Sequence, residues 1–207
     1  MNIRQSIVNQ FKQPHGLLGT LAGHVMANRP SNIERNLWML ELLELKRNDR
    51  VLEIGYGPGV ALERVLKTVD DGIVIGIDHS ETMFKQASRR MATAISKGKL
   101  KLLTGDIESH PSFDTCFDHI YSANVIMFWK NPVAVFQHIQ SFLAPYGDVA
   151  TLFMPRHRNA TSKDSYKFGN EITNWLKQAG FADIHTEVKE FNGLAAVCVI
   201  ARGSGIQ

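Results

Sequence analysis

The stretch VLEIGYGPGV, residues 51–60, places three glycines at alternate positions directly after a short apolar run that contains one acid, Glu53. An apolar run of this length before a glycine cluster is typical of a buried strand. Glycine permits a positive φ in a tight turn and lets a ligand approach the main chain closely. We therefore expect a strand, then a loop over Gly55, Gly57 and Gly59 that holds a small molecule, then a helix whose first N–H groups face an anion.

Strand and helix patterns alternate through the rest of the chain. Apolar runs of strand type lie at 51–54, 73–78, 99–106, 117–125, 148–154, 183–191 and 194–201. Helical patterns lie at 31–46, 60–68, 81–96, 131–143 and 165–181. Asn192 and Gly193 between the last two runs indicate a hairpin. The sequence predicts an α/β fold with a doubly wound, seven-stranded, mostly parallel sheet that ends in an antiparallel hairpin.

The first helix has a start signal of its own. Ser31 is followed three positions later by Glu34, which is the spacing of a capping box. We therefore expect Ser31 to cap this helix.

Composition favours one domain in a reducing compartment. The chain has 207 residues, of which 44% are hydrophobic, enough for a single core. Its two cysteines, Cys116 and Cys198, are far apart in sequence, so we expect no disulfide and no metal site. The 23 basic and 20 acidic residues are interspersed, which argues against a nucleic-acid interface.

The apolar segment 16–27 is interrupted and too short to span a bilayer, so we expect a cytoplasmic protein without stable membrane insertion.

Two kinds of cofactor compete for the glycine loop. A dinucleotide site needs G-x-G-x-x-G, and the position of its third glycine is occupied by Val60. The pattern E-x-G-x-G-x-G instead resembles the first motif of the class I S-adenosylmethionine-dependent methyltransferases, in particular those that act on small molecules. Three further features follow in that family's order: Asp78 at the end of the second strand, Asp106 in TGDIE and Asn124 in NVIMFWKNP.

The resemblance implies a Rossmann-like fold, S-adenosylmethionine as cofactor and S-adenosylhomocysteine as product. It places Asp78 at the ribose hydroxyls, Asp106 at the adenine amino group, and Asn124 beside the reacting methyl group. Glu53 either orients the loop or accepts a hydrogen bond from the methionine ammonium. The expected cofactor-binding set is Glu53, Gly55, Tyr56, Gly57, Gly59, Asp78, His79, Asp106, Ile107 and Asn124.

Each of these roles has a plainer alternative. Tyr56, Phe128 and Trp129 contact a sulfonium or are apolar packing residues. Asp106 and Asn124 could simply form turns after their strands.

The resemblance also implies a small organic acceptor methylated by in-line displacement. His15, His24 and His157 are candidate general bases, and Arg156 could hold an anionic group. We expect residues 1–35 to form a helical lid and substrate segment and residues 36–207 to form the Rossmann-like cofactor-binding domain; an ordinary helix packed on the core is the alternative to a lid. The expected substrate contacts are Phe11, Leu18, Met26, Asn28, Phe128, Trp129 and Arg156.

Proteins with other functions could use the same glycine loop and acids. An RNA methyltransferase would need a contiguous basic face beside the pocket, which the sequence only hints at. A non-catalytic partner subunit that binds S-adenosylmethionine or S-adenosylhomocysteine would keep the same residues. A nicotinamide-dependent oxidoreductase is disfavoured by Val60. The acceptor atom and the oligomeric state are left open.

Overall fold

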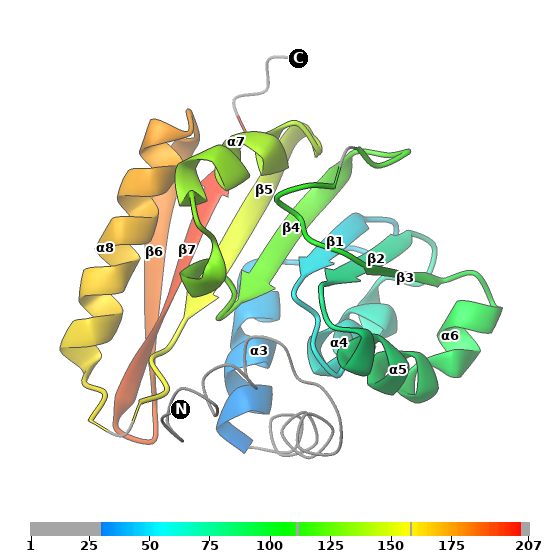
Figure 1. Cartoon of the computed structure of the whole chain (residues 1–207), viewed down its shortest axis with the longest axis horizontal. Helices are drawn as coiled ribbons and strands as arrows, with labels where there is room; N and C mark the ends of the chain where they lie inside the picture. The colour runs from blue at the N-terminus through cyan, green and yellow to red at the C-terminus, as the bar shows by residue number, and fades with distance from the viewer. Residues whose placement is uncertain (1–29, 111, 158, 204–207) are drawn as a thin grey trace, which may run out of the picture.

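A computed structural model describes residues 30–110, 112–157 and 159–203 of the chain (Figure 1). The elements, in chain order, are α3 (Pro30–Leu42), β1 (Arg50–Ile54), α4 (Val60–Thr68), β2 (Ile73–Asp78), α5 (Glu81–Arg90), α6 (Ala92–Ser96), β3 (Leu100–Thr104), β4 (Phe117–Ala123), the 3₁₀ turn η1 (Ile126–Phe128), α7 (Pro132–Gln140), β5 (Leu143–Phe153), α8 (Ser162–Gln178), β6 (Ala182–Phe191) and β7 (Leu194–Arg202).

The strands form a single sheet in the order β3-β2-β1-β4-β5-β7-β6. β3, β2, β1, β4 and β5 are parallel, whereas β7 is antiparallel to both β5 and β6. The predicted seven-stranded, mostly parallel sheet with a terminal hairpin is therefore confirmed. The strand order reverses between β1 and β4, so the crevice beyond their carboxyl ends is where a ligand is expected.

Helices cover both faces of the sheet, as alternating patterns predict. Buried residues of α3, α4 and α5 form one core layer with Val51, Tyr121 and Leu152. Buried residues of α7 and α8 form the other with Leu52 and Ile120. Figure 1 shows α8 beside β6 and β7, while α4, α5 and α6 lie near β1, β2 and β3.

Several element boundaries differ from those expected. Ser31 lies inside α3, which begins at Pro30, so the predicted cap at Ser31 is wrong. Proline suits the first turn of a helix, because the N–H that it lacks has no partner there. α3 is continuous across residue 35, and its buried residues Trp38, Met39 and Leu40 pack in the same core layer as those of α4.

The later boundaries follow local hydrogen bonds. α8 begins earlier than expected because Thr161 and Asp164 form a capping box. The expected hairpin turn is present, with φ of 51° at Asn192 and 79° at Gly193. In the described part of the chain, no helix is both long enough and apolar enough to cross a membrane.

Candidate functional site

The glycine loop connects β1 to α4 at the point where the strand order reverses. Its three glycines all have positive φ: 74° at Gly55, 52° at Gly57 and 81° at Gly59. A Cβ at Gly55 would lie 2.3 Å from Val125 Cγ2, and one at Gly59 would lie 2.5 Å from Met91 Cε. A Cβ at Gly57 would have no atom of the described residues within 4 Å. The outer two glycines therefore allow the loop to pack, and Gly57 is where the main chain is open to a ligand.

Asp78 holds this loop from the neighbouring strand. Its carboxylate accepts hydrogen bonds from the backbone N–H of Gly57, at 2.8 Å, and of Ser80, at 2.9 Å. The N–H of Gly55 donates to the carbonyl oxygen of Ile77 at 2.7 Å, which fixes the start of the loop against β2. The open glycine and the acid at the end of β2 are thus parts of one hydrogen-bonded unit.

Asp78 retains capacity for a ligand. Burial raises the pKa of its carboxyl group, while the N–H groups of Ser80 and Gly57 and the nearby His79 act in the opposite direction. His79 is exposed, with Nδ1 3.8 Å from Asp78 Oδ1. Each carboxylate oxygen accepts one backbone hydrogen bond and can accept another, so both oxygens could bind the two hydroxyls of a ribose.

Glu53 lies beneath the loop and is only 4% exposed. It accepts a hydrogen bond from the hydroxyl of Tyr121, at 2.9 Å, in the adjacent strand β4. Burial raises the pKa of Glu53 to about 8; the hydrogen bond from Tyr121 lowers it, nearby Asp78 raises it, and the backbone N–H of Leu62 in α4 lowers it. These contacts join β1, β4 and the start of α4, the helix that follows the loop, and both are contacts within the protein.

Tyr121 was not anticipated as part of this site. It lies opposite Glu53 in the β1–β4 register, and its side chain is fully buried. The alternation of the strand 117–125 indicates its face, but only the pairing of two distant strands brings it to Glu53.

Asp106 and Ile107 follow β3 at the same edge. Asp106 is exposed, and its Oδ1 accepts a hydrogen bond from the backbone N–H of Glu108 at 3.0 Å, as in a turn. Ile107 is 3% exposed and packs in the core layer of α7 and α8. The turn and the expected ligand contact are compatible, because the carboxylate has further acceptor positions.

Asn124 has a structural task at the end of β4. Its Nδ2 donates to the carbonyl oxygen of Met154 at 3.1 Å, and its Oδ1 accepts from the N–H of Met154 at 2.8 Å. Its φ is 55°. The Asn124 side chain thus ties the end of β4 to the residue after β5. The next residue, Val125, borders the glycine loop at Gly55 with its side chain.

The three aromatic candidates differ in their placement. Tyr56 is buried, and its hydroxyl donates to the carbonyl oxygen of Leu103 at 3.2 Å. Trp129 is buried and packs edge-on against Phe136, with ring centroids 5.3 Å apart. These two side chains occupy the core, which is the packing alternative, whereas Phe128 in η1 is half-buried.

Two polar residues that we expect near the methyl acceptor, one as a substrate contact and one as a general base, lie after β5. Arg156 is exposed and donates from Nη2 to Asn32 Oδ1 at 3.1 Å. His157 is exposed, with Nε2 3.9 Å from Asp164 Oδ2. The remaining candidates lie outside the described residues: Phe11, His15, Leu18, His24, Met26 and Asn28.

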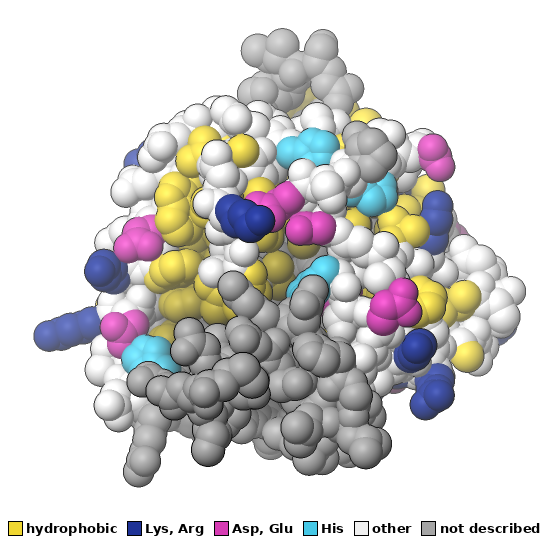
Figure 2. Space-filling model, in the orientation of Figure 1, with side chains coloured by type: hydrophobic (Ala, Val, Ile, Leu, Met, Phe, Trp, Pro, Cys, Tyr) yellow, Lys and Arg dark blue, Asp and Glu magenta, His cyan; other side chains and the backbone are white. Residues whose placement is uncertain are grey.

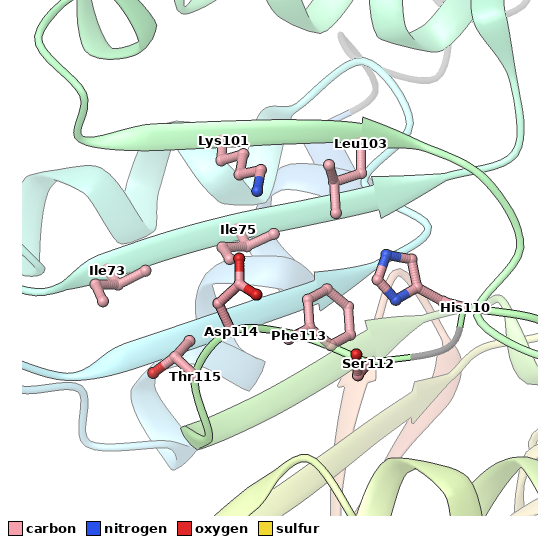
Figure 3. Close-up of a pocket in the computed structure, with 9 residues that line it drawn as sticks. All are labelled: Ile73, Ile75, Lys101, Leu103, His110, Ser112, Phe113, Asp114 and Thr115. Atoms are coloured by element: carbon pink, nitrogen blue, oxygen red, sulfur yellow. The ribbon is translucent and has the colours of Figure 1, made fainter.

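A separate cavity of about 290 Å³ lies on β2 and β3, on the face opposite α4 and α5 (Figure 3). Ile73 and Ile75 line it from β2, and Phe113 and Asp114 line it from the segment that precedes β4. The glycine loop contributes nothing to its lining, so it is not part of the candidate site. In the described ranges, no cluster of three or more His, Cys, Asp or Glu side chains has the arrangement of a metal site.

Comparison with known proteins decides the family. The family described as methyltransferase domain matches residues 51–147. An uncharacterized methyltransferase, YdaC of Bacillus subtilis strain 168, is 33% identical over 182 residues, which are 88% of this chain and 97% of that protein. The chain belongs to the class I S-adenosylmethionine-dependent methyltransferases.

Solved methyltransferase structures share this fold. A SAM-dependent methyltransferase from Aquifex aeolicus superposes with a TM-score of 0.70 at 22% identity, over 85% of this chain and 94% of that one. The N-methyltransferase NodS from Bradyrhizobium japonicum WM9, in complex with S-adenosylhomocysteine, superposes with a TM-score of 0.67 at 17% identity, over 86% and 89% of the two chains.

The site of this methyltransferase fits the family's cofactor. Gly57 leaves the main chain open where a side chain would otherwise stand, and Asp78 has acceptor positions left for a diol. Asp106 presents an exposed carboxylate at the same edge of the sheet.

Proposed function

We propose that this methyltransferase transfers the methyl group of S-adenosylmethionine to a small organic acceptor by in-line displacement. The observation that carries the proposal is the unit formed by Gly57 and Asp78, an open stretch of main chain hydrogen-bonded to a buried acid at the strand-order reversal. Bound S-adenosylmethionine supplies a methyl group that its sulfonium has already activated. The protein then mainly has to align the acceptor, and alignment can contribute on the order of 7–11 kcal/mol.

The described residues divide the work of binding. Asp78 accepts hydrogen bonds from the ribose, and Asp106 with Ile107 binds the adenine. Gly57 admits the methionine end of the cofactor, and Gly55 and Gly59 allow the loop to pack in the shape that leaves Gly57 open. Glu53, in the strand that leads into the loop, is held in place by the hydrogen bond that it accepts from the hydroxyl of Tyr121.

The acceptor side involves the segments after β4 and β5. Phe128 provides a half-buried aromatic surface, and Arg156 provides a cation. His157 is the candidate base within the described ranges, together with His15 and His24 of the segment that we propose to be a lid, residues 1–35. An acceptor that loses its proton before or during transfer would require such a base.

A methyl-transfer assay tests the proposal. The purified chain is incubated with S-adenosylmethionine and acceptors in nitrogen, oxygen, sulfur and carbon classes, and S-adenosylhomocysteine formation is measured. The proposal is supported if S-adenosylhomocysteine forms only when an acceptor is present and if Gly57→Ala does not form it. Binding of S-adenosylhomocysteine without turnover on any acceptor class would instead favour the non-catalytic partner subunit.

An RNA acceptor is the second candidate among enzymes. On the face shown in Figure 2, the described Lys and Arg side chains are scattered among acidic ones and do not form a continuous basic area. Phosphate contacts dominate nucleic-acid affinity, so a contiguous basic face is expected of an RNA enzyme. This surface therefore favours a small acceptor.

A further inference from the structure

The sheet has a long open edge at β6. This strand stands last in the strand order, and among the described strands it pairs with β7 alone (Figure 1). It has ten residues, and every residue from His185 to Glu190 is exposed. The opposite edge strand, β3, has five residues. An edge strand presents N–H and C=O groups that can pair with another strand, so β6 offers the larger surface for such pairing.

The hairpin geometry determines which main-chain groups face outward. A two-residue turn joins β6 to β7, so that Phe191 lies opposite Leu194. In such a hairpin the residues that flank the turn form the first hydrogen-bonded pair, and every second residue along the strand is bonded in the same way. The N–H and C=O groups of Thr186, Val188 and Glu190 therefore point to the open side.

The regular part of β6 is centred on one of these residues. The pairing with β7 runs without interruption from His185 to Phe191, whereas its register shifts between Ala182 and His185, where Asp183 has a φ of 46°. The middle residue of the uninterrupted part is Val188. Two copies of β6 related by a two-fold axis at Val188 would pair antiparallel over this whole part.

The charges on β6 are complementary to themselves about this axis. Glu187 of one copy would lie opposite Lys189 of the second copy, and the symmetry repeats this pair on the other side of the axis. An axis at Glu187 or at Lys189 would instead place two like charges opposite each other, which is unfavourable. An axis at Thr186 would extend the pairing into the irregular residues before His185. The axis at Val188 is therefore the favoured one.

Exposed apolar side chains occur at the same place. Val188 is 46% exposed and Tyr166 of α8 is 47% exposed, and they are two of five large hydrophobic residues that are exposed in the described part of the chain. About the proposed axis, Val188 would face its own copy across a hydrogen-bonded pair of strands. Burial of this side chain would therefore favour association.

Two contacts place Tyr166 beside β6. Thr173 Oγ1 of α8 lies 3.4 Å from Thr186 Oγ1, and Ser162 Oγ accepts from the N–H of Ala195 near the hairpin turn. α8 thus runs along β6 between these two contacts. Tyr166 comes seven residues before Thr173, which places it on the same side of the helix. It therefore lies beside the middle of the regular part of β6.

We propose that the edge of β6 is the interface of a symmetric homodimer, in which two copies of β6 pair antiparallel about a two-fold axis at Val188. The sheets of the two copies then form one continuous sheet, and α8 of each copy lies beside the axis. The inference goes beyond the proposed methyl transfer. β4, β5 and β7 separate β6 from β1, so the interface leaves the glycine loop accessible.

Analytical ultracentrifugation of the full chain over a range of micromolar concentrations tests the interface. We expect a species of twice the 23.2 kDa chain mass that dissociates on dilution. Val188→Pro removes an outward N–H and no hydrogen bond to β7, so it should raise the dissociation constant at least about tenfold while circular dichroism shows a folded protein. Val188→Ile keeps the N–H and the apolar side chain, and it should dimerise as the unmodified chain does.

Charge exchange tests the register. Glu187→Lys and Lys189→Glu should each weaken the dimer about tenfold, because each places like charges opposite each other. An equal mixture of these two variants should form mixed dimers, since each copy supplies the charge that the other now requires. The double variant should dimerise as well. Lys67→Glu makes the same change of charge at an exposed position of α4 and should have no effect.

Three outcomes would overturn the interface. They are a chain that sediments as a monomer at every concentration, a dimer that Val188→Pro and the charge variants leave unchanged, and single charge variants whose association is not restored by mixing. S-adenosylhomocysteine should bind all these variants as it binds the unmodified chain. Failure to bind the unmodified chain would count against the proposed function and not against the interface.

Discussion

The hydroxyl of Tyr121 donates a hydrogen bond of 2.9 Å to Glu53, so a buried acid under the glycine loop is held by the adjacent strand. This contact joins β1 and β4, the two strands between which the sheet reverses its order. The floor of the cofactor site is therefore a polar pair inside the core. Its ionisation links the stability of the fold to pH.

The first prediction concerns that ionisation. Burial raises the pKa of Glu53 from 4.5 to about 8, so the folded protein keeps a proton that the unfolded chain loses. The stabilising effect of the proton is present in full below about pH 4.5 and is lost as pH rises toward about 8. Gln does not titrate, so the unfolding free energy of Glu53→Gln should fall less steeply as pH rises. The difference in slope should be up to about 1.4 kcal/mol per pH unit.

Urea unfolding of both proteins at several pH values between 5 and 8 measures this difference. Parallel pH profiles of the unfolding free energy would show that Glu53 does not titrate in this range.

The second prediction separates the roles of the glycines. Gly55→Ala should destabilise the fold by about 2–5 kcal/mol, because its φ is 74° and its Cβ would lie 2.3 Å from Val125 Cγ2. Gly57→Ala should cost only about 1–2 kcal/mol, the strain of a positive φ, because no atom of the described part of the chain lies within 4 Å of the added Cβ. Its main effect should be loss of S-adenosylhomocysteine binding.

Gly98→Ala is the matched control for Gly57→Ala. Gly98 also has a positive φ, 70°, and none of the described atoms within 4 Å of its Cβ position, but it precedes β3 at the opposite end of the strand. Denaturation should show an equal loss of stability in the two variants. Calorimetry should show that only Gly57→Ala loses S-adenosylhomocysteine binding. Normal cofactor binding by Gly57→Ala would contradict the role given to this glycine.

The third prediction concerns Asp78. Asp78→Asn should weaken S-adenosylhomocysteine binding by about tenfold or more, because charge-assisted hydrogen bonds to the ribose become neutral ones. Circular dichroism should show a folded protein. Asp71→Asn, at an exposed acid in the turn before β2, serves as the control and should bind normally. Unchanged affinity in Asp78→Asn would refute its assignment to the ribose.

The fourth prediction concerns a charged cluster of Asp49, just before β1, His119 of β4 and Asp148 of β5. His119 lies between Asp148, at 2.8 Å from Nδ1, and Asp49, at 3.2 Å from Nε2. Burial lowers the pKa of His119, but the two carboxylates outweigh it, so the net direction is upward from 6.5. The stabilisation is therefore full below pH 6.5 and is lost as pH rises through the higher folded-state pKa.

His119→Asn should accordingly destabilise the fold more at pH 6 than at pH 9, as measured by urea unfolding. The control is His185→Asn, at an exposed position of the edge strand β6. A destabilisation by His119→Asn that does not change with pH would mean that the cluster acts through packing alone.

The sequence predicted the fold because its signals are local. Apolar runs such as 73–78 and 194–201, and the Asn192–Gly193 turn, are read over a few residues. The order of Glu53, Asp78 and Asp106 along the chain also placed these acids at one edge, because parallel strands end on the same side.

The contacts between distant segments could not be predicted in this way. Tyr121 meets Glu53 only because the sheet pairs β4 with β1. Arg156 meets Asn32 only because the fold brings the segment after β5 next to α3. Tyr56 stands within the glycine motif, yet its side chain turns into the core and bonds to Leu103. A motif identifies which residues surround a ligand but does not give the direction of each side chain.

Titration calorimetry of the full chain with S-adenosylhomocysteine, with NADH as the control ligand, tests the central claim most directly. We predict binding on the order of micromolar for S-adenosylhomocysteine, its loss in Gly57→Ala, and no heat from NADH. Binding of NADH, or silence from S-adenosylhomocysteine in a folded protein, would contradict the account.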